Sequence, residues 1–209
     1  MKLNLDKYKN IIFDLGGVIY NINYQLTINA FKDLGISNFD QLFSQAKQQQ
    51  LFDRYEKGHI TTIEFRKSIN AMCGNQLSDK QIDGAWNALL LDLPASRLEV
   101  LSKVNKTHRI FLLSNTTELH IGAINDYLKE NFNNNDLHPY FEKVYFSYEI
   151  GMRKPDTEIF QYVLNENALK AEETLFIDDS IQHIEGARKL EIQAYWLDIT
   201  KESIETVFI

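Results

Sequence analysis

Five short apolar runs along the chain each end on a polar residue. They cover residues 11–13, 110–113, 144–146, 175–177 and 194–197. Runs of this length that do not alternate with polar residues are typical of strands buried on both faces. Such strands form parallel sheets that helices cover on either side, so the pattern predicts an α/β protein.

The segment from residue 24 to residue 91 has a different pattern and contains no convincing strand. Its apolar residues recur at helical spacing, and Gly35, Gly58 and Gly74 separate the helical stretches. We therefore predict that residues 21–92 form an all-helical cap domain, inserted after the first strand.

From residue 94 onward the predicted helices and strands alternate. The helices cover 95–105, 117–130, 157–168 and 181–190, and the strands cover 109–113, 143–146, 174–177 and 193–197. Alternation of this kind predicts a doubly wound, Rossmann-like α/β core with right-handed crossovers, made of residues 1–20 and 93–209.

Charge and composition narrow the classes of partner. The formal net charge of −7 argues against nonspecific nucleic-acid binding, which needs a basic surface. The first ten residues are polar and charged, so no signal peptide and no membrane partner is expected. A single cysteine, Cys73, cannot form an internal disulfide, and a cytoplasmic location is the simplest expectation. The oligomeric state is left open.

Residues capable of phosphate chemistry stand where the predicted strands end. Asp14 follows the first strand, Ser114 and Asn115 follow the second, and Asp178 and Asp179 follow the fourth. In open parallel sheets ligands bind outside the carboxyl ends of the strands, so these side chains should converge on one crevice. Two adjacent carboxylates are costly to desolvate unless a hard cation binds them, so the acidic pair predicts a Mg²⁺ site.

Several of these residues also have ordinary structural explanations. Asp14 could cap the glycine turn after it, and Ser114 with Asn115 could cap the helix predicted at 117–130. Asp179 or Ser180 could cap the helix predicted at 181–190, with Asp178 left in contact with water. A helix start also offers free N–H groups to a phosphoryl oxygen, so capping and phosphate binding are compatible in that motif.

Lys154, which precedes Pro155, has two interpretations as well. It is either a solvated surface lysine or a point charge that neutralises a phosphate and the attacking carboxylate. Adjacent side chains of an extended segment diverge, so Arg153 should point away from any site that Lys154 enters.

The motifs occur in a recognisable order along the chain. They are Asp14 followed by Gly16-Gly17-Val18, then Ser114-Asn115, Lys154-Pro155 and Asp178-Asp179. In this order, and with a helical insert after the first motif, they resemble the haloacid dehalogenase (HAD) superfamily of hydrolases. The segments around Lys154 and Asp178 are similar to the branch that has a helical cap and includes many small-molecule and sugar phosphatases.

This resemblance implies a phosphoaspartyl mechanism with Mg²⁺ as cofactor. Asp14 would be the nucleophile, and the ion would be held by Asp14, the Gly16 carbonyl and Asp179, with Asp178 bound directly or through water. The phosphoryl oxygens would be held by Ser114, the Asn115 N–H and Lys154. Phosphoryl transfer depends mainly on alignment and charge neutralisation, which a metal ion and a lysine supply.

One position departs from the usual phosphatase motif. A second aspartate two residues after the nucleophile normally acts as general acid and base, and here that residue is Gly16. General acid–base catalysis is worth roughly 10²–10⁴-fold. Either the leaving group departs with little protonation, or the cap or the substrate supplies the proton, or activity is low. In the cap, Glu56 and His59 are candidates for contact with the substrate, although for each residue taken singly a solvated helix end is the favoured explanation.

Three functions therefore compete. The first is a Mg²⁺-dependent phosphatase of a small phosphorylated metabolite, with a sugar phosphate as the favoured class. The second is a 2-haloacid dehalogenase, which also lacks the second aspartate but needs no metal, so the acidic pair argues against it. The third is a weakly active relative that binds a phosphorylated ligand without turnover, which Gly16 favours.

Overall fold

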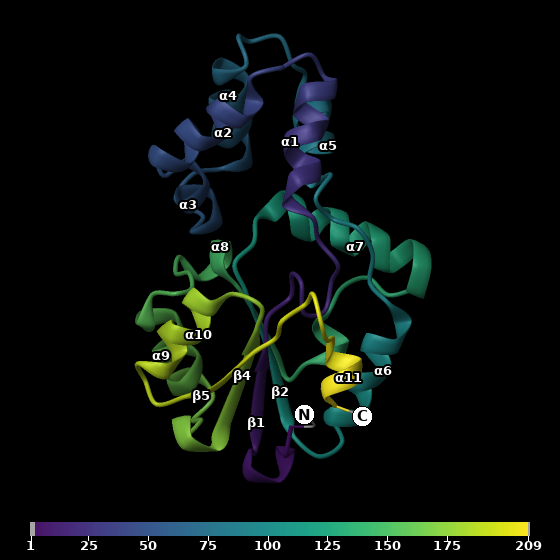
Figure 1. Cartoon of the computed structure of the whole chain (residues 1–209), viewed down its shortest axis with the longest axis vertical. Helices are drawn as coiled ribbons and strands as arrows, with labels where there is room; N and C mark the ends of the chain where they lie inside the picture. Colours follow the sequence, from purple (N-terminus) through teal and green to yellow (C-terminus); the bar gives the residue numbers. More distant parts are fainter. Residues whose placement is uncertain (1–2, 209) are drawn as a thin grey trace.

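The computed structural model describes residues 3–208 and is built around one parallel sheet (Figure 1). Its strands are β1 (Asn10–Phe13), β2 (Arg109–Ser114), β3 (Lys143–Phe146), β4 (Thr174–Asp178) and β5 (Gln193–Trp196). Their spatial order is β3-β2-β1-β4-β5, and all four pairings are parallel. The chain winds outward from β1 on one side and from β4 on the other, so a crevice opens between the carboxyl ends of these two strands.

Helices cover both faces of this sheet. The core helices are α6 (Ala95–Val104), α7 (Glu118–Phe132), α8 (Ser147–Ile150), α9 (Thr157–Glu166), α10 (Ile181–Arg188) and α11 (Ile204–Val207). Short 3-10 turns lie at Leu5–Lys7, His138–Tyr140 and Ala171–Glu173. None of the helices within residues 3–208 is long and apolar enough to cross a membrane.

The side chains of alternate residues in β1 point to opposite faces of the sheet, and helices bury both faces. Ile11 and Phe13 belong to an apolar cluster with side chains of α6, α7 and α11. Ile12 belongs to a second cluster with side chains of α9 and α10. Burial on both sides explains why the strand sequences are continuously apolar. The predicted doubly wound α/β fold is confirmed.

Strand β5 is the exception to this double burial. Its four residues are half-buried or exposed, and the Trp196 side chain at its end is 41% exposed. β5 lies at the edge of the sheet and pairs only with β4. The expectation that all five apolar runs are buried on both faces is therefore wrong for the last one.

The segment between β1 and α6 is helical, as its sequence pattern predicts, and we call it the helical cap. It comprises α1 (Tyr24–Asp33), α2 (Phe39–Gln48), α3 (Leu51–Glu56), α4 (Thr62–Met72) and α5 (Asp79–Asn87). These helices share an apolar cluster of their own, in which Phe65 contacts both Tyr55 and Trp86. Domain boundaries at residues 20/21 and 92/93 stay a prediction.

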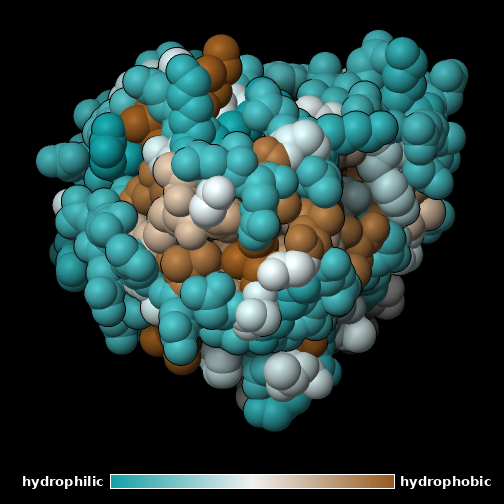
Figure 2. Space-filling view, turned by 90° about the horizontal axis from the view of Figure 1, so that it is seen from above, coloured by the Kyte–Doolittle hydropathy of each residue, from teal (hydrophilic) through white to brown (hydrophobic). Residues whose placement is uncertain are grey.

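The helical cap lies over the carboxyl end of the sheet (Figure 1). Its Trp86 ring stacks on His120 of α7, with centroids 5.3 Å apart and the rings nearly parallel. The turn after α3 rests on α8, because a Cβ atom at Gly58 would lie only 2.2 Å from the Tyr148 carbonyl oxygen. Seen from above, on the cap side, the surface is hydrophilic around its rim and hydrophobic in a central band (Figure 2).

Candidate active site

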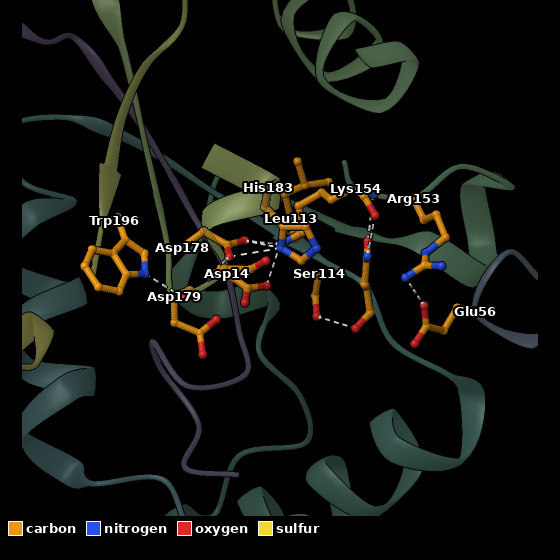
Figure 3. A network of polar contacts seen from close by, with 12 residues as sticks. Asp14, Glu56, Leu113, Ser114, Arg153, Lys154, Asp178, Asp179, His183 and Trp196 are labelled. Atoms are coloured by element: carbon orange, nitrogen blue, oxygen red, sulfur yellow. Dashed lines mark hydrogen bonds and ion pairs between the residues drawn. The ribbon is translucent and has the colours of Figure 1, made fainter. Parts of the chain in front are cut away.

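Three carboxylates meet in the crevice between β1 and β4. Asp14 directly follows β1, Asp178 is the last residue of β4, and Asp179 comes next. The Asp14 backbone N–H donates to the Ile177 carbonyl at 2.9 Å, so the sheet fixes where this side chain begins. An oxygen atom from each carboxylate lies within 4.8 Å of the other two (Figure 3). The fold thus brings together carboxylates from distant parts of the sequence.

Lys154 joins two of these carboxylates. Its side chain is fully buried, and its Nζ donates to Asp14 Oδ1 at 2.6 Å, to Asp178 Oδ2 at 2.7 Å and to the Leu113 carbonyl at 2.8 Å. All three N–H bonds of the ammonium group are therefore used. Burial alone would lower the pKa of Lys154, but the charges of Asp14 and Asp178 outweigh burial and raise the pKa. The alternative of a solvated surface lysine is excluded.

The Asn115 side chain fixes the backbone of Lys154. Its Oδ1 accepts from the Lys154 N–H at 2.9 Å, and its Nδ2 donates to the Lys154 carbonyl at 2.8 Å. Two hydrogen bonds to one residue set both the position and the direction of the lysine side chain. The amide of Asn115 is thus committed to Lys154, whereas its backbone N–H takes part in none of the hydrogen bonds found among residues 3–208.

The ionisation of the three carboxylates differs with their surroundings. Burial raises the pKa of Asp14 to about 6, because it outweighs the attraction of Lys154. Burial also raises the pKa of Asp179 to about 7, with a further contribution from the charges of Asp14 and Asp178. For Asp178 the effect of burial is outweighed by Lys154 and His183, so its pKa lies below the usual value.

Asp178 and Asp179 differ in how many partners they have. Asp178 accepts from the Ser180 N–H at 2.7 Å, and His183 Nδ1 lies 3.0 Å from both of its oxygens. Among the described residues, no side-chain hydrogen bond holds the Asp179 carboxylate (Figure 3). The contact of His183 with the site was not predicted from the sequence. Its position in the first turn of α10, shortly after the acidic pair, could have indicated that its side chain lies near Asp178.

The backbone of Gly17 leaves room for Asp179. Gly17 has a positive φ of 77°, and a Cβ atom there would lie 2.4 Å from Asp179 Oδ2. The carboxylate therefore packs directly against the turn after β1, which only glycine allows. An all-oxygen set of three carboxylates, one of them without a partner and costly to ionise alone, fits a hard divalent cation.

Asp14 and Asp179 line a cavity of about 340 Å³ between the core and the helical cap. Ser114 and Asn115 lie on its floor beside Asp14, and Tyr24 and Glu56 reach it from the cap. Ser114 Oγ makes only a long contact of 3.5 Å, to the Asn115 carbonyl, so this hydroxyl is available to a ligand.

The two cap candidates lie in different places. Glu56 lines the cavity, and its Oε2 is 3.1 Å from Arg153 Nη2. His59 is exposed and lines a neighbouring cavity with Lys57 and Asp156, so the structure does not bring it together with Asp14. The expectation that Arg153 points away from the site is wrong, because Arg153 lines both cavities and pairs with Asp53 and Glu56.

Gly16 also lines the main cavity, at the position where the usual motif has an aspartate. A Cβ atom at this glycine would lie 2.8 Å from Ile22 Cδ1. An apolar side chain therefore occupies the space next to position 16, and no acid is available there. The Gly16 carbonyl accepts no hydrogen bond from the residues between 3 and 208, so it is free to bind a cation.

A doubly wound core with a helical insert after its first strand, and with carboxylates and a buried lysine where the central strands end, defines a capped Rossmann-like hydrolase. The chain belongs to the haloacid dehalogenase-like hydrolases, whose family model matches residues 11–197. The resemblance inferred from the four motifs is thereby confirmed.

The similarity to known proteins extends over nearly the whole chain. A D-ribitol-5-phosphate phosphatase from Bacteroides thetaiotaomicron is 30% identical over 189 residues, which make up 90% of either chain. A HAD family enzyme from the same organism, solved in complex with magnesium and inorganic phosphate, has a TM-score of 0.83 at 38% identity and covers 93% of this chain and 96% of its own. A predicted HAD-like hydrolase from Porphyromonas gingivalis has a TM-score of 0.81 at 29% identity, with 91% of each chain covered.

Proposed function

We propose that this protein is a Mg²⁺-dependent phosphatase that hydrolyses a small phosphorylated metabolite through a phosphoaspartyl intermediate on Asp14. The observation that carries the proposal is the carboxylate cluster, in which the single charge of Lys154 is shared by Asp14 and Asp178 and the three carboxylates together keep a net negative charge for a cation. The activity named for the Bacteroides relative and the magnesium and phosphate bound by the similar structure support the same class of reaction.

Asp14 is the nucleophile in this proposal. One of its oxygens attacks phosphorus in line as the bond to the ester oxygen breaks, and water then cleaves the acyl phosphate to release inorganic phosphate. A pKa of about 6 leaves the Asp14 carboxyl group mostly ionised at neutral pH, as a nucleophile must be.

The phosphoryl oxygens are held by Ser114 Oγ, by the Asn115 N–H and by Lys154. Because all three N–H bonds of Lys154 already have partners, the lysine must exchange one of them for a phosphoryl oxygen. When bound, Mg²⁺ would be held by Asp14, the Gly16 carbonyl and Asp179, with Asp178 bound directly or through water, and it would supply the remaining charge neutralisation.

The leaving group receives no proton from position 16. Gly16 has no side chain, and Ile22 fills the adjacent space. The rate should therefore depend strongly on how readily the ester oxygen departs, with p-nitrophenyl phosphate among the fastest substrates. An anomeric sugar oxygen leaves more readily than an ordinary alcohol, so on this ground we favour a sugar phosphate esterified at the anomeric oxygen. Sugar-alcohol phosphates, whose ester oxygens are ordinary alcohols, are candidates because of the activity named for the Bacteroides relative.

The proposal is tested by assaying the purified protein on sugar phosphates, sugar-alcohol phosphates and p-nitrophenyl phosphate. We expect release of inorganic phosphate that requires Mg²⁺, stops on addition of EDTA and returns with excess Mg²⁺. No hydrolysis of p-nitrophenyl phosphate in the presence of Mg²⁺ would contradict the proposal and favour ligand binding without turnover. Halide release from a 2-haloacid that is insensitive to EDTA would indicate a dehalogenase instead.

We propose that Glu56 contacts the hydroxyl groups of the substrate. Burial raises the pKa of Glu56, despite the attraction of Arg153, so this carboxylate gains from a hydroxyl that donates to it. Glu56→Gln should lower kcat/KM for the best sugar phosphate by about tenfold or more, which is the usual worth of a hydrogen bond to a charged group.

The comparison substrate for Glu56→Gln is p-nitrophenyl phosphate, which has no sugar hydroxyls and should be hydrolysed at the parent rate. A matched control is Glu149→Gln, since Glu149 is exposed on α8 and does not line the cavity. An equal loss on both substrates would show that Glu56 acts on the fold rather than on the substrate.

A further inference from the structure

Trp196, the last residue of β5, contacts the acidic pair from outside the motifs. Its indole Nε1 donates to the Asp179 carbonyl at 2.9 Å (Figure 3). The side chain is 41% exposed, so the apolar core does not explain its placement. Trp196 is therefore a large, partly exposed side chain whose single polar atom donates a hydrogen bond to a residue of the site.

The hydrogen bonds of the sheet stop one residue before Asp179. Asp178 pairs in register with Trp196, and the Asp178 carbonyl accepts from the Leu197 N–H at 3.0 Å. The next carbonyl, that of Asp179, lies beyond the end of β4 and has no strand partner. The indole of Trp196 supplies the missing donor, so the backbone is fixed on both sides of the Asp179 side chain.

The Asp179 carboxylate itself depends on this backbone anchor. Its oxygen packs against Gly17, and no side-chain hydrogen bond from the described residues directs it. By contrast, Asp178 is held by Lys154, Ser180 and His183. The position of Asp179 is therefore set by the contact with Gly17 and by the path of its main chain.

We propose that Trp196 is a positioning residue for the divalent cation, which it serves by anchoring the Asp179 main chain through its indole N–H. This inference rests on the cation site of the proposed function. A carboxylate that is already in place binds an ion without first losing conformational freedom, so the anchor should act on metal affinity rather than on the chemical step.

The test is Trp196→Phe, which keeps an aromatic ring and removes the donor. We expect the Mg²⁺ concentration for half-maximal activity to rise by about threefold to tenfold, as for the loss of one hydrogen bond. At saturating Mg²⁺ the value of kcat should be close to the parent value. The melting temperature of the metal-free variant should be close to that of the metal-free parent. Mg²⁺ should raise the melting temperature of both proteins, but the variant should need a higher Mg²⁺ concentration for the same increase.

The control is Ile199→Ala, which removes exposed apolar surface near the end of β5 without touching a hydrogen bond to Asp179. Parent Mg²⁺ affinity in Trp196→Phe, or a fall in kcat that saturating Mg²⁺ does not restore, would overturn the inference. Because the thermal shift with Mg²⁺ needs no substrate, this result is independent of whether the protein is a phosphatase. Failure of the parent to hydrolyse any phosphate ester would count only against the proposed function.

Discussion

Asp14→Asn should reduce phosphate release by about 10⁴-fold or more, because the amide cannot form the bond to phosphorus on which the proposed reaction depends. The substitution keeps the shape of the side chain, and an amide oxygen can still accept the Lys154 hydrogen bond that the carboxylate accepts at 2.6 Å. The variant should therefore fold. Turnover is measured as inorganic phosphate released from p-nitrophenyl phosphate and from the best sugar phosphate at saturating Mg²⁺.

A matched control is Asp198→Asn. Asp198 also follows a strand of the sheet, but its carboxylate bonds to Thr200 and Lys201 and lies outside the cavity. Parent activity is expected for this variant. Mass spectrometry of the acid-quenched parent should find one added phosphoryl group on Asp14. Substantial turnover by Asp14→Asn, or a phosphoryl group on another residue, would mean that the nucleophile is wrongly assigned.

The sheet and the place of the site could be predicted from the sequence because one physical rule covers both. Strands buried on two faces must be apolar throughout, and ligands of a parallel sheet meet at its carboxyl end. That rule was sufficient to bring Asp14 and Asp178 together across most of the chain. It failed for β5, since an apolar run of four residues does not reveal that its strand lies at the edge.

The sequence could not show which of the two candidate residues in the helical cap lines the main cavity. Glu56 and His59 are only three residues apart, yet one lines the main cavity and the other a neighbouring one. What decides between them is the docking of the turn after α3 onto α8, where Gly58 lies against the Tyr148 carbonyl. Contacts between distant segments of this kind leave no periodic signal in the sequence. For the same reason the indole of Trp196 gave no sign of its contact with Asp179.

Lys154→Met should be the most destabilising single change at the site. Methionine fills a similar volume but leaves the carboxylates of Asp14 and Asp178 buried without a counter-charge. Removing one partner of a buried ion pair costs about 3–5 kcal/mol, and urea unfolding at pH 8 should show a loss of free energy of unfolding in this range. Turnover should be lost at every Mg²⁺ concentration, because the charge that we propose to bind a phosphoryl oxygen is absent.

The loss of stability in Lys154→Met should depend on pH. Without the lysine, burial and mutual repulsion hold the pKa values of both carboxylates above those of the unfolded chain. Carboxylates with raised pKa values destabilise the folded state at a pH where they must ionise. The difference in free energy of unfolding between Lys154→Met and the parent should therefore be largest at pH 8. It should shrink as the pH falls, because both carboxylates become protonated. Lys57→Met is the matched control, because its pair with Asp156 is partly exposed and such pairs contribute about 0–1 kcal/mol. A Lys154→Met protein as stable as the parent at pH 8 would show that the carboxylates do not need this charge, and the electrostatic basis of the site would then be wrong.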